Sequence, residues 1–251
     1  DWAKQAMQQL TKQKIHIVSR VRGRHKKWLD MALHNAKQLL MQQLSQQMNI
    51  TKQLAQLARI LAIPRDIQRI ECFDNSHTQG AQMVGVCVVC GPHGMDKSLY
   101  RRYNLHDMSS GDDYAAMSQV LTRRYSRIKK VEGTLPDLII VDGGKGQLNI
   151  AKKVCEELQL PGISLMAMAK GKARKSGQET IWIAGKSEPL HLASDQALFH
   201  LLQHIRDESH RFAIIGHRKQ RARASTHMRL QDIPGIGAVL RRRLLEHFSS
   251  M

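Results

Sequence analysis

The sequence has 251 residues, of which 39 are Lys or Arg and 21 are Asp or Glu, so its formal net charge is +18. The hydrophobic content of 42% is enough for a folded core, and no apolar stretch is long enough to span a bilayer. A surface this basic attracts polyanions by counterion release and favours nucleic acid as the partner, against a generically basic protein or a binder of membrane surfaces.

The four cysteines predict buried thiols in a reduced, cytoplasmic protein. Cys87 and Cys90 have the spacing of a metal-binding pair, but they lie in an apolar run that predicts a strand. Side chains three residues apart on a strand point to opposite faces, so these two thiols cannot easily share one metal ion.

Residues 1–66 form the first of three predicted domains, a helical and Gln-rich arm or linker. Apolar residues follow helical spacing from Lys27 onward, and Thr51 fits the N-cap of a further helix that ends before Pro64. Because the chain begins at Asp1 rather than at Met, we expect it to be part of a longer protein.

The second predicted domain, residues 67–224, opens with three strands, over 70–74, 83–90 and 99–105. Glycine and proline residues in the connections predict an antiparallel meander.

The rest of this domain alternates helices and strands. They are predicted over 111–127 (helix), 137–142 (strand), 147–158 (helix), 164–169 (strand), 180–193 (small hairpin) and 194–212 (long helix). Three antiparallel strands followed by helix, strand, helix and strand are the chain order of the ribonuclease H fold. The fold class predicted is therefore α/β, with a mixed five-stranded sheet flanked by helices. In this arrangement the strand over 137–142 lies parallel to the strand over 70–74, with the intervening helix as a right-handed crossover.

The third predicted domain, residues 225–251, is a partial helix-hairpin-helix DNA-binding domain and contains Leu230-Gln-Asp-Ile-Pro-Gly-Ile-Gly-Ala-Val-Leu240. This stretch has the form of a helix-hairpin-helix, in which backbone N–H groups of a glycine turn contact one DNA phosphate without reading bases. The alternative is an ordinary connection between two helices.

Asp74 and Asp142 each end an apolar strand, where burying a charge is costly unless it is paired or bound to a metal. Each could instead cap the loop that follows it. If the two strands are adjacent and parallel, both carboxylates meet at one sheet edge and repel each other unless a cation lies between them. A divalent metal meets that need and suits phosphoryl chemistry.

His210 lies on the flank of the apolar stripe of the long helix, about 120° from Leu198, from where it can point toward the sheet edge. The residues alone do not single it out among thirteen histidines. Further candidates, each more often a helix cap or a solvated charge, are Asp112, Asp113, Asp207 and Glu208.

Gly143-Gly-Lys-Gly146 follows a strand and precedes a helix, where phosphate is often bound. The spacing is neither GxGxxG nor that of a Walker loop, so a nucleotide site is the weaker interpretation. A tight turn that places Asp142 near a substrate phosphate fits at least as well.

Five segments together resemble the C-terminal half of bacterial UvrC, over about residues 67–248. They are Cys72-Phe-Asp-Asn-Ser-His77, Tyr100-Arg-Arg-Tyr103, Gly111-Asp-Asp-Tyr-Ala-Ala-Met117, Val141-Asp-Gly-Gly-Lys-Gly-Gln147 and Arg206-Asp-Glu-Ser-His-Arg-Phe-Ala213. The resemblance implies a ribonuclease-H-like endonuclease that makes the 5′ incision in nucleotide excision repair. It places the catalytic triad on Asp74, Asp142 and His210, and it suggests that Asp113 also matters for this cut.

We expect Mg²⁺ or Mn²⁺ as the cofactor, held by Asp74, Asp142 and His210. The resemblance further implies damaged double-stranded DNA and UvrB as partners, and a bacterial cytoplasmic, nucleoid-associated location. The family's 3′-incision domain and UvrB-docking segment have no counterpart among the motifs of this sequence. We expect DNA contacts from the residues Lys145, Arg206, Arg218, Lys219, Gly235, Gly237 and Arg241.

Two alternatives from other functional classes stay open. A non-catalytic DNA-binding module would keep the basic tail and use the acidic residues as caps. A nucleotide-binding switch would use Gly143–Gly146.

Overall fold

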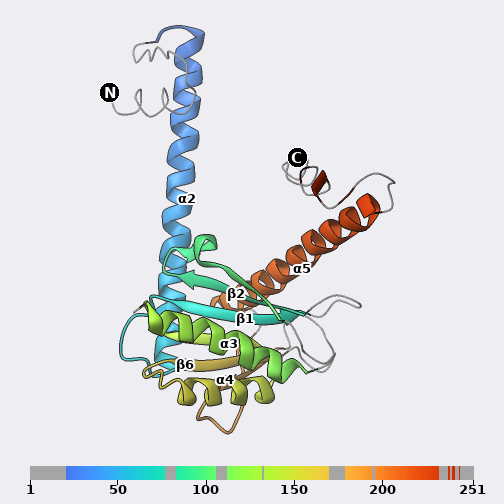
Figure 1. Cartoon of the computed structure of the whole chain (residues 1–251). Coiled ribbons are helices and arrows are strands. Elements are labelled where there is room, and N and C mark those ends of the chain that lie inside the picture. The colour runs from blue at the N-terminus through green and yellow to red at the C-terminus, as the bar shows by residue number, and fades with distance from the viewer. Residues whose placement is uncertain are drawn as a thin grey trace. The chain divides into compact units, whose positions relative to one another are not determined.

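The computed structural model describes residues 21–76, 83–105, 112–131, 133–169, 179–193, 196–231, 237, 239–240 and 243, with the backbone alone for Ser76 and for 216–231. Internal contacts divide the chain into two units, Asp1–Met48 and Asn49–Met251. The sheet belongs to the second unit (Figure 1). The sequence assigned residues up to 66 to the arm, whereas the contacts place the division at residue 48. The predicted division at 224 stays a prediction.

Helix α2 spans Arg24–Ile60 without a break, so the helix predicted to start at Thr51 is not a separate element. The stretch holds no Gly or Pro and is rich in Gln, Leu, Lys and Ala, all of which have high helix propensity. It ends before Ala62, whose φ of +52° is left-handed, and before Pro64. The last turns of α2 bury Leu54 and Leu57 in the core of the second unit.

The sheet has seven strands in the order β3-β2-β1-β5-β6-β7, with β4 also paired to β2. The strands are β1 Ile70–Ser76, β2 Val84–Gly91, β3 Gly94–Met95, β4 Arg101–Asn104, β5 Leu138–Asp142, β6 Ser164–Ala169 and β7 Thr180–Ile183. Strand β5 runs parallel to both β1 and β6, and the remaining pairs are antiparallel. The mixed α/β architecture is confirmed.

The count of five strands is corrected to seven. Strand β3 is separate from β4 because the 3-10 turn Lys97–Leu99, capped by Asp96, interrupts the run along the edge of β2. Strand β7 pairs with β6 and extends the sheet, while the predicted hairpin partner contributes only one bridge, Ile181 to Leu190.

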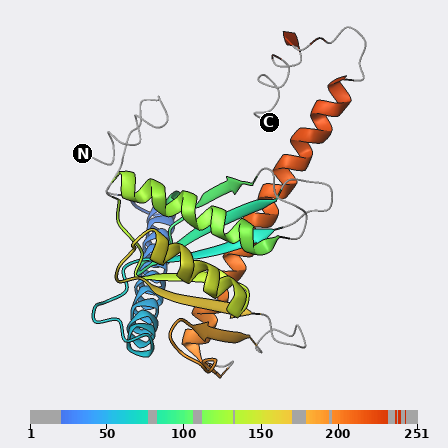
Figure 2. The same ribbon diagram turned by 60° about the horizontal axis from the view of Figure 1, so that its bottom comes forward.

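Helices cover both faces of the sheet. Helices α3 (Asp113–Lys130) and α4 (Lys145–Glu157) lie on one face, and α5 (Ala197–Gln231) lies on the other with the end of α2 (Figure 2). Helix α5 continues well beyond the predicted end at residue 212. The apolar stripe marks only the part of α5 that packs on the sheet, and no proline interrupts the backbone before residue 234.

All four cysteines are free and buried. Cys87 belongs to the core under α3 and α4, whereas Cys90 belongs to the core under α5. The two thiols therefore lie on opposite faces of the sheet, as their spacing predicted.

Helix α3 approaches the sheet closely at Gly85 in β2. A Cβ added there would lie 2.2 Å from Cγ2 of Val120 and 3.0 Å from Oδ1 of Asn75, so α3 would have to move. We expect Gly85→Ala to lower the free energy of unfolding by about 1–3 kcal/mol, as overpacking of a core usually does. The measurement is urea unfolding, with Val120→Ala added to the variant as the control. If the second substitution restores no stability, the proposed steric cause is wrong.

Candidate metal centre

Two of the predicted ligands come from neighbouring parallel strands. Asp74 lies in β1 and Asp142 is the last residue of β5, and the register pairs Phe73 with Val141 just before them. Both carboxylates therefore lie at the carboxyl edge of the two strands. Asp74 is buried, at 5% exposure, and Asp142 is half-buried.

His210, on the helix α5 that packs on the sheet, completes this group. One ligand atom from each of Asp74, Asp142 and His210 can be chosen so that all three lie within 4.8 Å of one another. Nδ1 of His210 lies 3.1 Å from Oδ2 of Asp74. The exposed fraction of the side chain is 46% for His210 and 7% for Asp74. The group is therefore open to solvent on the side of α5.

The donor set fits a divalent cation. Ligand atoms at about 2.1 Å from one ion lie no more than about 4.2 Å apart, so this group needs only a small contraction. Two carboxylates suit Mg²⁺ or Mn²⁺, and imidazole is a better ligand for Mn²⁺ than for Mg²⁺. In the part of the chain that the structure describes, it is the one group of three such donors.

The predicted DNA contact Arg206 lies instead in a buried ionic cluster, one turn before His210 on α5. Its guanidinium is 7% exposed, with Nη1 3.1 Å from the Glu179 carboxylate and Nη2 2.8 Å from that of Asp207. Burial acts to lower the pKa of Arg206, but the hydrogen bond to Asp207 and the charges of Asp207, Glu179 and Asp142 leave that pKa above its usual value. The structure therefore offers no free guanidinium here for a phosphate.

The turn of α5 that carries His210 is fixed to the sheet by its neighbours. The Ser209 hydroxyl donates to the Arg206 carbonyl at 2.6 Å and accepts a weak bond from the Cys72 thiol at 3.6 Å. The Tyr100 hydroxyl donates to the buried Glu208 carboxylate at 3.1 Å. The hydrogen bond from Arg211, opposed by burial, holds the pKa of Glu208 below its usual value. The residue pattern missed the positioning contacts of Ser209 and Glu208, since helical periodicity gives no side-chain partner.

The acidic residues of the Gly111–Met117 segment lie at the start of α3. Asp112 is the N-cap and accepts the N–H of Ala115 at 2.9 Å. Asp113 is exposed, and its backbone carbonyl accepts a hydrogen bond from Asn75 at 3.4 Å, so the start of α3 lies beside the end of β1. Its carboxylate is not part of the three-donor group.

The glycine loop after Asp142 is a tight turn into α4. Gly143 has a φ of +150°, which strongly favours glycine, and an added Cβ would lie 2.7 Å from the Gln147 side chain. That side chain accepts the N–H of Gly144 at 3.1 Å. Lys145 is exposed, with Nζ 4.0 Å from the centre of the Trp182 ring and 3.3 Å from the Ser187 carbonyl. The loop thus serves to turn the chain beside Asp142.

The remaining predicted DNA contacts are placed only in part. Arg218 and Lys219 lie on α5, where the backbone alone is described. Gly235 and Arg241 lie outside the described residues, as does most of the predicted helix-hairpin-helix. A Cβ added at Gly237 would have none of the described atoms within 4 Å.

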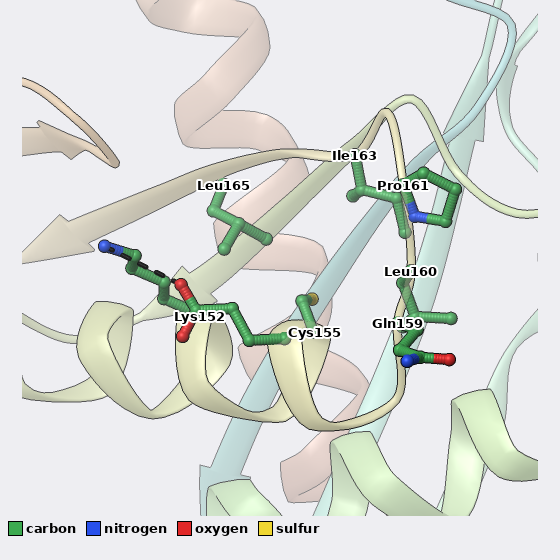
Figure 3. Close-up of a pocket in the computed structure, with 8 residues that line it drawn as sticks. Lys152, Cys155, Gln159, Leu160, Pro161, Ile163 and Leu165 are labelled. Atoms are coloured by element: carbon green, nitrogen blue, oxygen red, sulfur yellow. Dashed lines mark ion pairs between the residues drawn. The ribbon is translucent and has the colours of Figure 1, made fainter.

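A groove of about 570 Å³ lies at the far end of α4 from Asp142. Cys155 and Leu160 line it together with Leu165 of β6, and the Lys152–Glu156 ion pair lies at its rim (Figure 3). No predicted site residue lines this groove.

Among the described residues, no helix combines the length and the apolar character needed to cross a membrane.

Comparison with known proteins gives consistent matches. The family model of the UvrC RNAse H endonuclease domain matches residues 58–214, and that of the UvrC ribonuclease H-like domain matches residues 1–43. The chain is 46% identical to UvrABC system protein C of Coxiella burnetii over 250 residues, which cover 100% of this chain and 41% of that protein. It is also 46% identical to UvrABC system protein C of Pseudomonas aeruginosa, over 94% of this chain and 39% of that protein.

The chain thus spans about two fifths of the length of these relatives. Among solved structures, human ENDOV matches 70% of this chain and 99% of its own, with 13% identity and a TM-score of 0.38, and nothing about function follows from so slight a likeness. Because the first family model covers more than half of the sequence, the chain belongs to the UvrC RNAse H endonuclease domain family.

Proposed function

We propose that this chain is a divalent-metal-dependent DNA endonuclease that makes the 5′ incision in nucleotide excision repair. The observation that carries the proposal is the convergence of Asp74, Asp142 and His210 at one sheet edge, in a member of an endonuclease domain family. The net charge of +18 supports a nucleic acid substrate.

Asp74 and Asp142 would hold Mg²⁺ or Mn²⁺, with His210 as third ligand or as general base. The cation would supply a water of lowered pKa and stabilise charge on the phosphate as water adds and one P–O bond breaks. The buried Asp74 carboxylate orients the imidazole through Nδ1. With the proton on Nδ1, Nε2 is the basic nitrogen, the arrangement by which a carboxylate directs a general base.

Further parts of the proposal rest on the family. The relatives are named UvrABC system protein C, so we propose UvrB and damaged double-stranded DNA as partners, and a place at the bacterial nucleoid. Asp113, at the start of α3 beside β1, is proposed to assist the 5′ cut. The stretch from 225 onward is proposed to bind the DNA backbone through Gly235 and Gly237, followed by Arg241.

The direct test of the metal centre is thermal unfolding of the chain with and without Mn²⁺. At about 100 times the dissociation constant, bound ion adds about 2.7 kcal/mol. In a protein of this size we expect a rise in Tm of about 5–10 °C. If the glycine loop serves only to turn the chain, as we propose, ATP should leave Tm unchanged, whereas a rise in Tm with ATP would favour the nucleotide-binding alternative.

Asp74→Asn should abolish the Mn²⁺ shift, whereas Glu157→Gln, on the outer face of α4, should keep it. A shift that survives in Asp74→Asn would place the ion elsewhere. No shift in the unmodified chain would favour a non-catalytic DNA-binding module instead.

A further inference from the structure

Three arginines lie on or beside the short strand β4, at the edge of the sheet. Arg101 and Arg102 belong to β4 and Arg123 belongs to α3, and all three are exposed. Within the described residues, none of the three forms an ion pair with a carboxylate. Their positive charge is therefore uncompensated, although the chain pairs other arginines at 2.6–3.1 Å with Glu71, Asp137, Glu179, Asp207 and Glu208.

Neutral groups hold these guanidinium groups in place. Arg102 lies 4.5 Å from the centre of the Phe212 ring and donates to the Phe212 carbonyl at 3.0 Å. Arg123 donates to the Asn104 carbonyl at 2.8 Å and lies 5.5 Å from the centre of the Tyr103 ring. Arg101 donates to the carbonyls of Ser98 and Tyr100 at 2.9 and 2.7 Å.

These contacts orient the side chains without neutralising them. A guanidinium has five N–H donors, and these bonds to carbonyl oxygens use only one nitrogen of each group. Ordering a long side chain on binding costs conformational entropy, and part of that cost is already met in the folded chain. Pre-oriented, unpaired guanidinium groups are the pattern that suits recognition of phosphate.

The strand register relates this edge to the metal centre. Val86 of β2 pairs with Asp74 on one side and with Arg102 on the other. The three residues form one row across the sheet, so the backbones of Asp74 and Arg102 are two strand spacings, or about 10 Å, apart. Arg102 also contacts Phe212, two residues after His210, and therefore lies on the face of the sheet that carries the three-donor group.

We infer that Arg102 on the α5 side of β4, together with Arg101 and Arg123 on the α3 side of the same sheet edge, forms a contact surface for the sugar–phosphate backbone of duplex DNA beside the scissile phosphate. A separation of about 10 Å corresponds to about three base-pair steps of duplex rise, so one duplex can engage both the metal centre and this edge. Contacts to phosphate carry no base information, which suits an enzyme that cuts beside varied sequences. The inference rests on the proposed function, since it takes DNA as the substrate.

The test measures binding of a fluorescent duplex by anisotropy over a range of salt concentrations, without divalent metal so that no cleavage occurs. The slope of log Kd against log salt should fall by about 1 for each arginine that loses a phosphate contact. We therefore expect a fall of about 1 in Arg102→Gln and of about 2 in the Arg102→Gln/Arg123→Gln double variant. Lys153→Gln is the control, because it removes one positive charge that is paired with Glu157 on α4, and its slope should not change.

Arg102→Lys separates charge from structure. Lysine keeps the positive charge but loses the planar stack on Phe212, so the salt slope should recover if Arg102 contacts phosphate. Equal slopes in the unmodified chain and the double variant would overturn the inference while leaving the metal centre intact. If the unmodified chain binds no duplex at all, both the inference and the DNA substrate of the proposed function fail.

Discussion

Asp142→Asn should reduce the 5′ incision rate at least about 100-fold. Asparagine keeps the size of the side chain but removes the charge that, together with Asp74, would hold the cation at the edge of β1 and β5. Mutation of a residue that only hydrogen-bonds to a metal ligand typically lowers metal affinity or enzyme activity by about 10–100-fold. Mutation of a direct ligand should therefore have a larger effect. The measurement is the single-turnover rate of 5′ incision on a labelled, damaged duplex in a reconstituted repair reaction.

The matched control is Glu157→Gln, which makes the same charge change on the outer face of α4 and should leave the incision rate unchanged. Binding of the damaged duplex by the Asp142→Asn chain, measured without divalent metal, should equal that of the unmodified chain and report that the variant is folded. An Asp142→Asn protein that cuts on the 5′ side at the normal rate would refute the proposed centre.

His210→Gln distinguishes the two roles left open for the imidazole. As a ligand, His210 contributes to holding the ion, so the concentration of Mn²⁺ needed for half-maximal rate should rise. As a general base, His210 does not hold the ion. The Mn²⁺ concentration for half-maximal rate should then stay constant, while the rate at saturating Mn²⁺ falls. A variant with normal rate and normal Mn²⁺ dependence would exclude His210 from the centre.

Glu71→Ala should lower the free energy of unfolding by about 3–5 kcal/mol, the usual cost of breaking a buried ion pair from one side. The Glu71 carboxylate is fully buried in β1, and Arg124 of α3 donates to it at 2.6 and 3.1 Å. Arg69 and Tyr125 also donate to it, at 2.9 Å each. Its loss would leave the Arg124 guanidinium buried without its partner. Urea unfolding at neutral pH measures the effect.

The Glu71 carboxylate should also make the free energy of unfolding depend on pH. Burial acts to raise the pKa of Glu71, but the hydrogen bond and charge of Arg124, with Arg69 and Tyr125, outweigh it and leave the pKa below its usual value. A lowered pKa in the folded state stabilises the protein above the unfolded-state value of about 4.3, and this stability is lost as the pH falls through the folded-state value. Glu71→Gln should therefore lose less stability than the unmodified chain between pH 5 and strongly acidic pH.

The exposed pair Lys153–Glu157 provides the comparison, because breaking it should cost less than about 1 kcal/mol. Joint replacement, Glu71→Leu with Arg124→Met, should recover much of the stability lost in Glu71→Ala, since no buried charge is then left unpaired. If Glu71→Ala costs no more than the surface control, the buried network does not stabilise the fold.

The sequence by itself determined the order of the main strands and helices and placed Asp74 and Asp142 near the carboxyl ends of apolar strands. Asp142 does end β5, whereas β1 continues two residues beyond Asp74, to Ser76. Alternating and helical patterns are local, and a right-handed crossover leaves few ways to place β5 beside β1. From those two facts the meeting of both carboxylates at one edge follows. The opposite faces of Cys87 and Cys90 follow as directly, from the period of a strand.

Only the tertiary structure decided which polar side chains meet across the two layers. Helical spacing put His210 on the flank of α5 and Arg206 one turn earlier, and the resemblance alone ranked His210 above its neighbours. Where a flank residue points depends on how α5 packs across β1 and β2, which sets His210 3.1 Å from Asp74 and buries Arg206 against Glu179. That packing angle and register arise from contacts between residues far apart in the chain, such as Cys72 with Ser209, and no local pattern records them.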